Sequence, residues 1–160
     1  EFRLWPDIGD PQQIEYALAW KPPPGELAKL PKLKAILSFA AGVDHLMSDT
    51  ALPRHVPVVR AVSEASRLTM SGFCISQLLR YHHRLALYES FQRQGIWKQV
   101  PPRDMTETKV AVLGMGVLGA DLAARLQALG FAVNGWARSF RACDGVTRCS
   151  GSAGLVVCSG

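Results

Sequence analysis

The feature that most constrains this chain is a glycine-rich turn between an apolar run and a helix-like segment. Residues 109–113 (Lys-Val-Ala-Val-Leu) have the β-branched and apolar side chains of a buried strand. Gly114, Gly116 and Gly119 follow at once, with the spacing G-x-G-x-x-G. Apolar residues then recur at helical spacing until Gly130, which is typical of the end of a helix. This order predicts a parallel α/β unit.

The three glycines have separate physical roles in a turn of this kind. Gly114 permits the tight turn, Gly116 leaves room for a pyrophosphate against the backbone, and Gly119 lets helix and strand pack closely. Free amides at the start of the helix and its positive end then face the phosphates. The predicted dinucleotide-binding loop comprises Gly114, Met115, Gly116, Val117, Leu118 and Gly119. The alternative at this point is a glycine-rich turn that binds no ligand.

The end of the next predicted strand, 131–136, indicates which dinucleotide is bound. NAD sites place an acidic residue about 20 residues beyond the loop, where it accepts from the ribose 2′-hydroxyl. This chain has no acidic residue there. The same absence disfavours a methyltransferase, which would also need an acid for the ribose hydroxyls. The chain instead has arginines, whose guanidinium groups can bind a 2′-phosphate through two parallel hydrogen bonds. We therefore expect NADP in preference to NAD, held by Trp136, Arg138, Ser139 and Arg141. The alternative is that these arginines are ordinary solvated side chains.

The first part of the chain also alternates predicted strands with short helices or turns. Strands are expected over 16–20, 33–39 and 56–60, and Pro57 favours an edge position for the third. One long amphipathic helix is expected over 69–94, ended by Gly95. Residues 101–104 (Pro-Pro-Arg-Asp) have the composition of a linker. We expect one domain over 1–103 and a second over 104–160.

Composition narrows the remaining possibilities. Hydrophobic residues make up 48% of the chain and charged residues 19%, which excludes a disordered chain. No apolar run is long enough to cross a membrane and no secretory pattern opens the chain, so we expect a cytoplasmic protein. The net charge of +5 (18 basic minus 13 acidic residues) is scattered, which favours a phosphate-bearing small molecule over a nucleic acid. The four cysteines lack metal-site spacing, so no metal site is predicted, and Cys74 is expected in the core.

Several motifs in order resemble one family. They are Trp5-Pro6-Asp7, Ala19-Trp20-Lys21-Pro22-Pro23, Phe39-Ala40-Ala41-Gly42-Val43-Asp44-His45-Leu46, Arg80-Tyr81-His82-His83-Arg84, the loop 114–119, and Gly135-Trp136-Ala137-Arg138. Together they resemble the D-isomer-specific 2-hydroxyacid dehydrogenases, and within them the glyoxylate/hydroxypyruvate reductase A branch. The resemblance covers roughly residues 3–145.

The resemblance implies an α/β fold with a partial flavodoxin-like substrate domain followed by a partial Rossmann dinucleotide-binding domain. It implies NAD(P)H-dependent reduction of a small 2-oxo acid, and a homodimer to which the helix over 69–94 contributes. The substrate carboxylate would bind backbone amides of Ala41, Gly42 and Val43, where small residues leave N–H groups open. Trp20 would border the same site.

The chain also departs from the family pattern. Gly72-Phe73 stands where the family usually has Glu-Tyr. The family's catalytic Arg, Glu and His correspond to positions beyond residue 160, so the chain resembles an internal fragment of a protein about twice as long. None of the four histidines is assigned a catalytic role, and we expect the 160-residue chain alone to be inactive. A dinucleotide-binding module, or a partner subunit without catalysis, is the alternative function.

Overall fold

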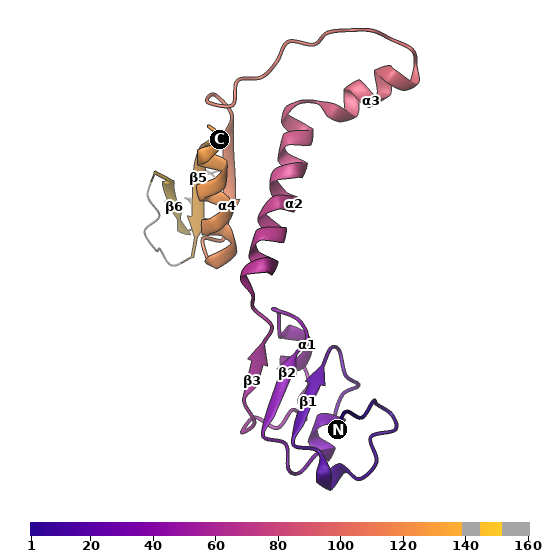
Figure 1. The fold of residues 1–160 in the computed structure, drawn as a ribbon. Helices are drawn as coiled ribbons and strands as arrows, with labels where there is room; N and C mark the ends of the chain where they lie inside the picture. Colours follow the sequence, from indigo (N-terminus) through magenta and orange to yellow (C-terminus); the bar gives the residue numbers. More distant parts are fainter. Residues whose placement is uncertain (139–144, 152–160) are drawn as a thin grey trace. The chain divides into compact units, whose positions relative to one another are not determined.

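The computed structural model describes residues 1–138 and 145–151 (Figure 1). Contacts between Cα atoms divide the chain into two compact units, Glu1–Ser63 and Glu64–Gly160. Each unit contains a three-stranded parallel sheet. The parallel α/β architecture predicted from the sequence is confirmed.

The first unit is built on the sheet β1 (Tyr16–Ala19), β2 (Ala35–Ser38) and β3 (Val58–Arg60), in that order. Short elements connect or precede the strands: η1 (Pro11–Gln13), η2 (Leu27–Lys29) and α1 (Asp44–Met47). The predicted strands are therefore correct in place and slightly too long. Pro57 precedes an edge strand, as its missing N–H predicts.

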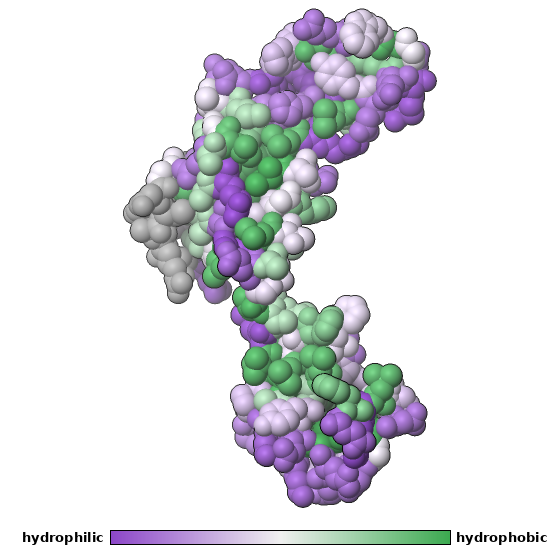
Figure 2. Space-filling model, in the orientation of Figure 1, coloured by the Kyte–Doolittle hydropathy of each residue, from purple (hydrophilic) through white to green (hydrophobic). Residues whose placement is uncertain are grey.

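One face of this sheet carries the core of the first unit. Ile36 and Leu46 are fully buried there, among Ala19, Leu27, Leu33, Leu52 and Val56. The opposite face presents large apolar side chains to solvent: Tyr16, Leu18, Trp20, Leu37, Phe39 and Val59. Leu18, Leu37 and Val59 form one row, because Leu18 pairs with Leu37 and Leu37 with Val59. Figure 2 shows hydrophobic surface on this unit.

The second unit is built on β4 (Lys109–Leu113), β5 (Ala132–Ala137) and β6 (Thr147–Ser150). The helix α4 (Val117–Ala128) connects β4 to β5 and packs on both strands. Gly130 follows it with φ +96°, the left-handed conformation expected after a helix. The strand β4 and helix α4 match the sequence prediction, whereas β6 was not predicted.

The predicted long helix over 69–94 is wrong in two respects, because it begins earlier, at Glu64, and it is two helices. The helix α2 spans Glu64–His82 and α3 spans Leu85–Arg93, separated at Arg84, which has φ +54°. The guanidinium of Arg80 binds both carboxylate oxygens of Glu89 at 2.5 and 2.7 Å, which holds the two helices across this break. Gly95, with φ +65°, follows the end of α3 as predicted.

The face of α2 that meets the second sheet is aliphatic. Ile75, Leu78 and Leu79 pack against the core formed by β4, α4 and β5. Two aromatic residues of the same helix, Phe73 and Tyr81, are exposed. Cys74, expected in the core, is only half-buried.

Since α2 packs on α4, the contacts group it with the second unit. The expected domain boundary at residue 103 concerns the family's domains and stays a prediction. No helix among the described residues is long and apolar enough to cross a membrane.

Candidate functional site

The glycine loop joins the end of β4 to the start of α4. The Gly114 amide donates to the Trp136 carbonyl at 2.8 Å, which ties the loop to the end of β5. Gly114 has φ +104°, a conformation that L-residues with a side chain rarely adopt. A Cβ on Gly119 would overlap the Gly114 carbonyl oxygen. The turn therefore requires glycine at both positions, as predicted from the spacing.

The Met115 side chain anchors the loop to the core of the second unit. Its side chain is buried in the second core with Val112, Ala123 and Val133. Only the backbone of Met115 is therefore available to a ligand, and its thioether supports the turn. Sequence reasoning placed Met115 in the loop but missed this anchoring role.

The loop leaves backbone donors and open space where phosphates would lie. Ala120 donates to the Gly116 carbonyl at 2.9 Å, so the amides of Val117 and Leu118 precede the first bond within the helix. The N-cap residue of α4 is Gly116, which has no side chain to cap the helix, and a Cβ built on it would meet none of the described atoms within 4 Å. A pyrophosphate fits this arrangement, because the helix start offers unpaired N–H groups and a positive dipole end.

The residues predicted to read the adenosine ribose lie at the end of β5. Arg138 directly follows the strand and is exposed. The Trp136 indole donates to the Gly151 carbonyl at 2.9 Å, so this N–H is already used within the chain. Ser139 and Arg141 lie outside the described residues. No carboxylate side chain stands between Asn134 and Arg138, so nothing in this stretch repels a 2′-phosphate.

A groove of about 340 Å³ lies behind the loop. Its walls come from α2, β4, the loop and α4, and include Met70, Cys74, Leu113, Gly114, Leu118 and Leu122. The strand β4 is at the edge of the described sheet, with this groove beside it. Most of its lining is apolar, so the groove itself is not suited to phosphate.

The second predicted site lies at the carboxyl ends of the strands in the first unit. After β2 the chain turns at Ala40, whose amide donates to the Ser38 hydroxyl oxygen at 3.2 Å. Ala41 and Gly42 then lie exposed, and Val43 is half-buried before α1. Trp20 directly follows β1 and is exposed, with the Lys21 ammonium 5.6 Å from its ring centroid.

Arg60 is a residue of this second site that sequence reasoning missed. It ends β3, and its Nε donates to the Ala41 carbonyl at 2.5 Å. A cation therefore lies beside the small-residue loop predicted to bind a carboxylate. Its position could have been inferred, because the carboxyl ends of neighbouring parallel strands meet at one edge of a sheet.

His82 occupies a structural position beside the core of the second unit. His82 is 2% exposed and packs edge-on against Phe131 at 5.2 Å between ring centroids. Its Nδ1 lies 3.4 Å from the Thr108 hydroxyl. His83 is exposed beside it, and His45 lies in α1 after the Ala41–Val43 loop. No histidine was assigned a catalytic role from the sequence, and none of these contacts assigns one.

The strand, braced glycine loop and uncapped helix define a Rossmann-type protein of the dinucleotide-binding class. A family model described as "D-isomer specific 2-hydroxyacid dehydrogenase, NAD binding domain" matches residues 75–151. The chain is thus similar to the D-isomer specific 2-hydroxyacid dehydrogenases, as its motifs indicated.

Similar proteins extend the likeness over most of the chain. It is 35% identical over 152 residues to glyoxylate/hydroxypyruvate reductase A of Yersinia enterocolitica, a match covering 92% of this chain and 49% of that protein. Among solved structures, a D-isomer specific 2-hydroxyacid dehydrogenase from Xanthobacter autotrophicus in complex with NADPH is 41% identical, with a TM-score of 0.84. That match covers 92% of this chain and 46% of the other.

A second solved structure, the NADPH-dependent glyoxylate/hydroxypyruvate reductase of Sinorhizobium meliloti in complex with NADP and sulfate, is 36% identical with a TM-score of 0.83. It is matched over 91% of this chain and 45% of its own. The chain thus spans about half the length of the relatives it matches.

Proposed function

We propose that the complete protein is an NADPH-dependent reductase of small 2-oxo acids, with glyoxylate or hydroxypyruvate as substrate. The observation that carries this proposal is the braced glycine loop, whose amides and open Gly116 face suit a dinucleotide pyrophosphate. The names of the relatives supply the substrate class, since the reductases of Yersinia and Sinorhizobium act on these two acids. A homodimer in the cytoplasm is part of the same proposal.

NADP is the proposed cofactor. Arg138 directly follows β5, and residues 134–138 contain no carboxylate, which suits the 2′-phosphate of NADP and not the free 2′-hydroxyl of NAD. The related structures from Xanthobacter and Sinorhizobium contain NADPH and NADP. When bound, the nicotinamide supplies the hydride for reduction.

The substrate carboxylate is proposed to bind the loop Ala41–Val43, with Trp20 at its border. The Arg60 guanidinium, held on the Ala41 carbonyl, would strengthen binding of this anion by charge. In this scheme the chain binds and orients both reactants. The acid that protonates the substrate oxygen belongs to the rest of the complete protein, because no residue in this chain is assigned that role.

The test compares the 160-residue chain with the complete protein in the same two assays. Titration with NADPH, followed by nicotinamide fluorescence, measures binding, and NADPH consumption with glyoxylate measures turnover. We expect the chain to bind NADPH without turnover and the complete protein to do both. Absence of glyoxylate and hydroxypyruvate reduction by the complete protein would overturn the proposed activity. Turnover by the 160-residue chain would overturn the assignment of the acid to another segment.

A further inference from the structure

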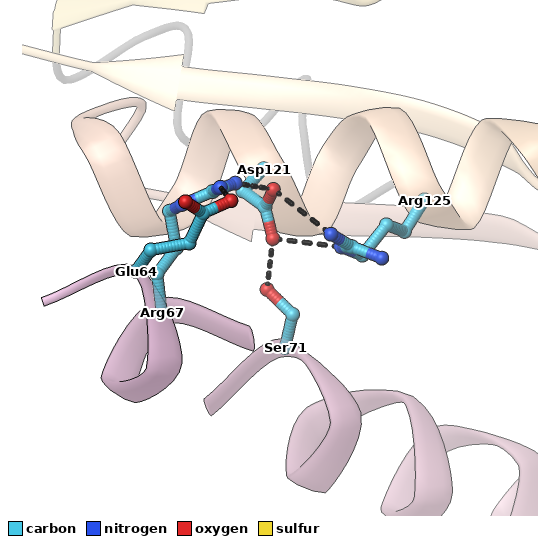
Figure 3. Close-up of polar contacts among 5 residues, drawn as sticks. All are labelled: Glu64, Arg67, Ser71, Asp121 and Arg125. Atoms are coloured by element: carbon cyan, nitrogen blue, oxygen red, sulfur yellow. Dashed lines mark hydrogen bonds and ion pairs between the residues drawn. The ribbon is translucent and has the colours of Figure 1, made fainter. Parts of the chain in front are cut away.

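One carboxylate joins the two helices behind the glycine loop. Asp121 is the fifth residue of α4, and its side chain is 10% exposed. It accepts from the Ser71 hydroxyl at 2.6 Å and from Nε of Arg125 at 2.8 Å, and it pairs with the Arg67 guanidinium (Figure 3). Arg67 also pairs with Glu64 at 3.0 Å. Both oxygens of the carboxylate are thus in use.

The partners of Asp121 fall into two kinds. Arg67 and Ser71 lie one turn apart on α2, so their bonds cross from one helix to the other. Arg125 lies one turn further along α4, so its bond stays within that helix. Ser71 is 2% exposed, which shields its hydrogen bond from water. The two kinds of contact can be removed separately.

The part of α2 that contacts Asp121 also lies next to the glycine loop. Ser71 lines the groove behind the loop together with Gly114, Leu118 and Gly119. Gly119 in turn cannot shift toward the Gly114 carbonyl, since there is no room even for a Cβ. A bond that fixes α4 against α2 therefore also limits movement of the first turn of α4.

We propose that Asp121 is a positioning residue for the dinucleotide pyrophosphate. By pinning α4 to Ser71 and Arg67 of α2, it holds the amides of Val117 and Leu118 where the phosphates would bind. The inference rests on the proposed function, because it assigns no role to Asp121 unless the loop binds a dinucleotide.

The charges of the cluster agree with this role. A bare carboxylate one turn from a helix start would repel an incoming diphosphate, since like charges this close interact strongly. Arg67 and Arg125 both contact Asp121 and offset its charge. The cluster thus stabilises the helix pair without weakening the positive end of α4.

The experiment uses the 160-residue chain and two ligands. NADPH contains the pyrophosphate, whereas adenosine 2′-monophosphate carries the 2′-phosphate without it. Ser71→Ala and Asp121→Asn remove or weaken contacts between helices, and Arg125→Gln removes only the contact within α4. Binding of NADPH is followed by fluorescence and binding of the monophosphate by ligand-observed NMR, at a temperature where circular dichroism shows each variant folded.

We expect Ser71→Ala and Asp121→Asn to weaken NADPH binding about five- to tenfold, as loss of one buried hydrogen bond predicts. Their affinity for adenosine 2′-monophosphate should stay unchanged, and Arg125→Gln should bind both ligands like the unaltered chain. General loss of structure would instead weaken both ligands together.

Equal weakening of both ligands, or unchanged NADPH affinity in Ser71→Ala, would overturn the inference while leaving the proposed function intact. If Asp121→Asn does not fold, Ser71→Ala alone decides. Absence of NADPH binding by the unaltered chain would overturn the proposed function, and the inference with it.

Discussion

Gly135 of β5 lies directly against the thioether of Met115, so a Cβ on Gly135 would come within 2.7 Å of the Met115 sulfur. It would also lie 2.8 Å from Cγ1 of Val146. This contact links the glycine loop to the centre of the second sheet, and it makes the absence of a side chain at residue 135 a condition for the loop's shape.

Gly135→Ala is therefore expected to destabilise the second unit by about 1–3 kcal/mol, the usual range for overpacking a filled core. Urea unfolding followed by circular dichroism measures the change. The matched control is Gly72→Ala in α2, where a Cβ would meet nothing within 4 Å. That change should stabilise the chain by roughly 0.5–1 kcal/mol through helix propensity. Equal effects of the two substitutions would contradict the packing argument.

Substitutions of the loop glycines should distinguish effects on the free energy of unfolding from effects on NADPH affinity. Gly119→Ala places a methyl group on the Gly114 carbonyl and should reduce both stability and NADPH affinity. Gly116→Ala meets open space, so its free energy of unfolding should change by no more than about 0.5 kcal/mol. Its methyl group would nevertheless occupy the side from which phosphates approach, and NADPH affinity should fall about tenfold or more. Unchanged affinity in Gly116→Ala would place the phosphates elsewhere.

Stability at acid pH should depend on Asp121. Hydrogen bonds from Arg125 and Ser71 lower the pKa of Asp121 from its ordinary 3.8 to about 2. A carboxyl whose pKa is lowered by folding stabilises the native state fully above its unfolded value, and this contribution is lost as pH falls through the folded value. The advantage of the unaltered chain over Asp121→Asn should thus be constant above about pH 5, shrink below about pH 4 and be mostly lost by about pH 2.

Urea unfolding of both chains between pH 2 and pH 6 measures this difference. Other carboxylates titrate in the same range, but they do so in both chains and therefore cancel in the comparison. A difference that does not change with pH would show that Asp121 carries no such shift.

Arg138 should determine the choice between the two nicotinamide dinucleotides. Arg138→Gln removes the cation proposed to bind the 2′-phosphate and should weaken NADPH binding about tenfold, in line with the loss of a charge-assisted hydrogen bond. NADH lacks this phosphate, so its affinity should change little. The ratio of the two dissociation constants, measured by fluorescence titration, gives the result. Equal weakening of both dinucleotides would argue against contact with the 2′-phosphate.

The uncovered face of the first sheet should make the isolated chain associate. Parallel sheets are normally covered on both faces, yet the row Leu18, Leu37 and Val59 is open to solvent here. We expect the chain to bind a hydrophobic dye and to elute as oligomers at micromolar concentration. Leu18→Lys with Val59→Lys should reduce both signals, whereas a lysine at the exposed Ala28 should leave them unchanged.

The parts of the fold predictable from the sequence are those that depend on local pattern. The glycine loop was found because its spacing, the preceding strand and the following helix all lie within about twenty consecutive residues. The break at Arg84 was missed because no glycine or proline marks it, and the Arg80–Glu89 pair that fixes it spans nine residues. β6 was missed because its segment, Thr147–Ser150, has no apolar alternation and gains its place only by pairing with β5.

The contacts that complete both sites depend on tertiary structure. Arg60 reaches Ala41 only because β3 lies beside β2, and Asp121 meets Ser71 across 50 residues of sequence. The sequence pattern predicts which backbone faces each ligand, and this stays a prediction. The side chains that hold this backbone in place make contacts between residues far apart in the sequence, which no local pattern indicates.

Met115 has two separate roles. Its backbone forms part of the turn proposed to bind the dinucleotide, and its thioether contacts only the interior of the second unit. Natural variation at this position should consequently follow the size of its neighbours at 135 and 146 and be indifferent to which nucleotide a given homologue prefers. A bulkier residue at 135 should be accompanied by a smaller one at 115, in NAD-using and NADP-using enzymes alike.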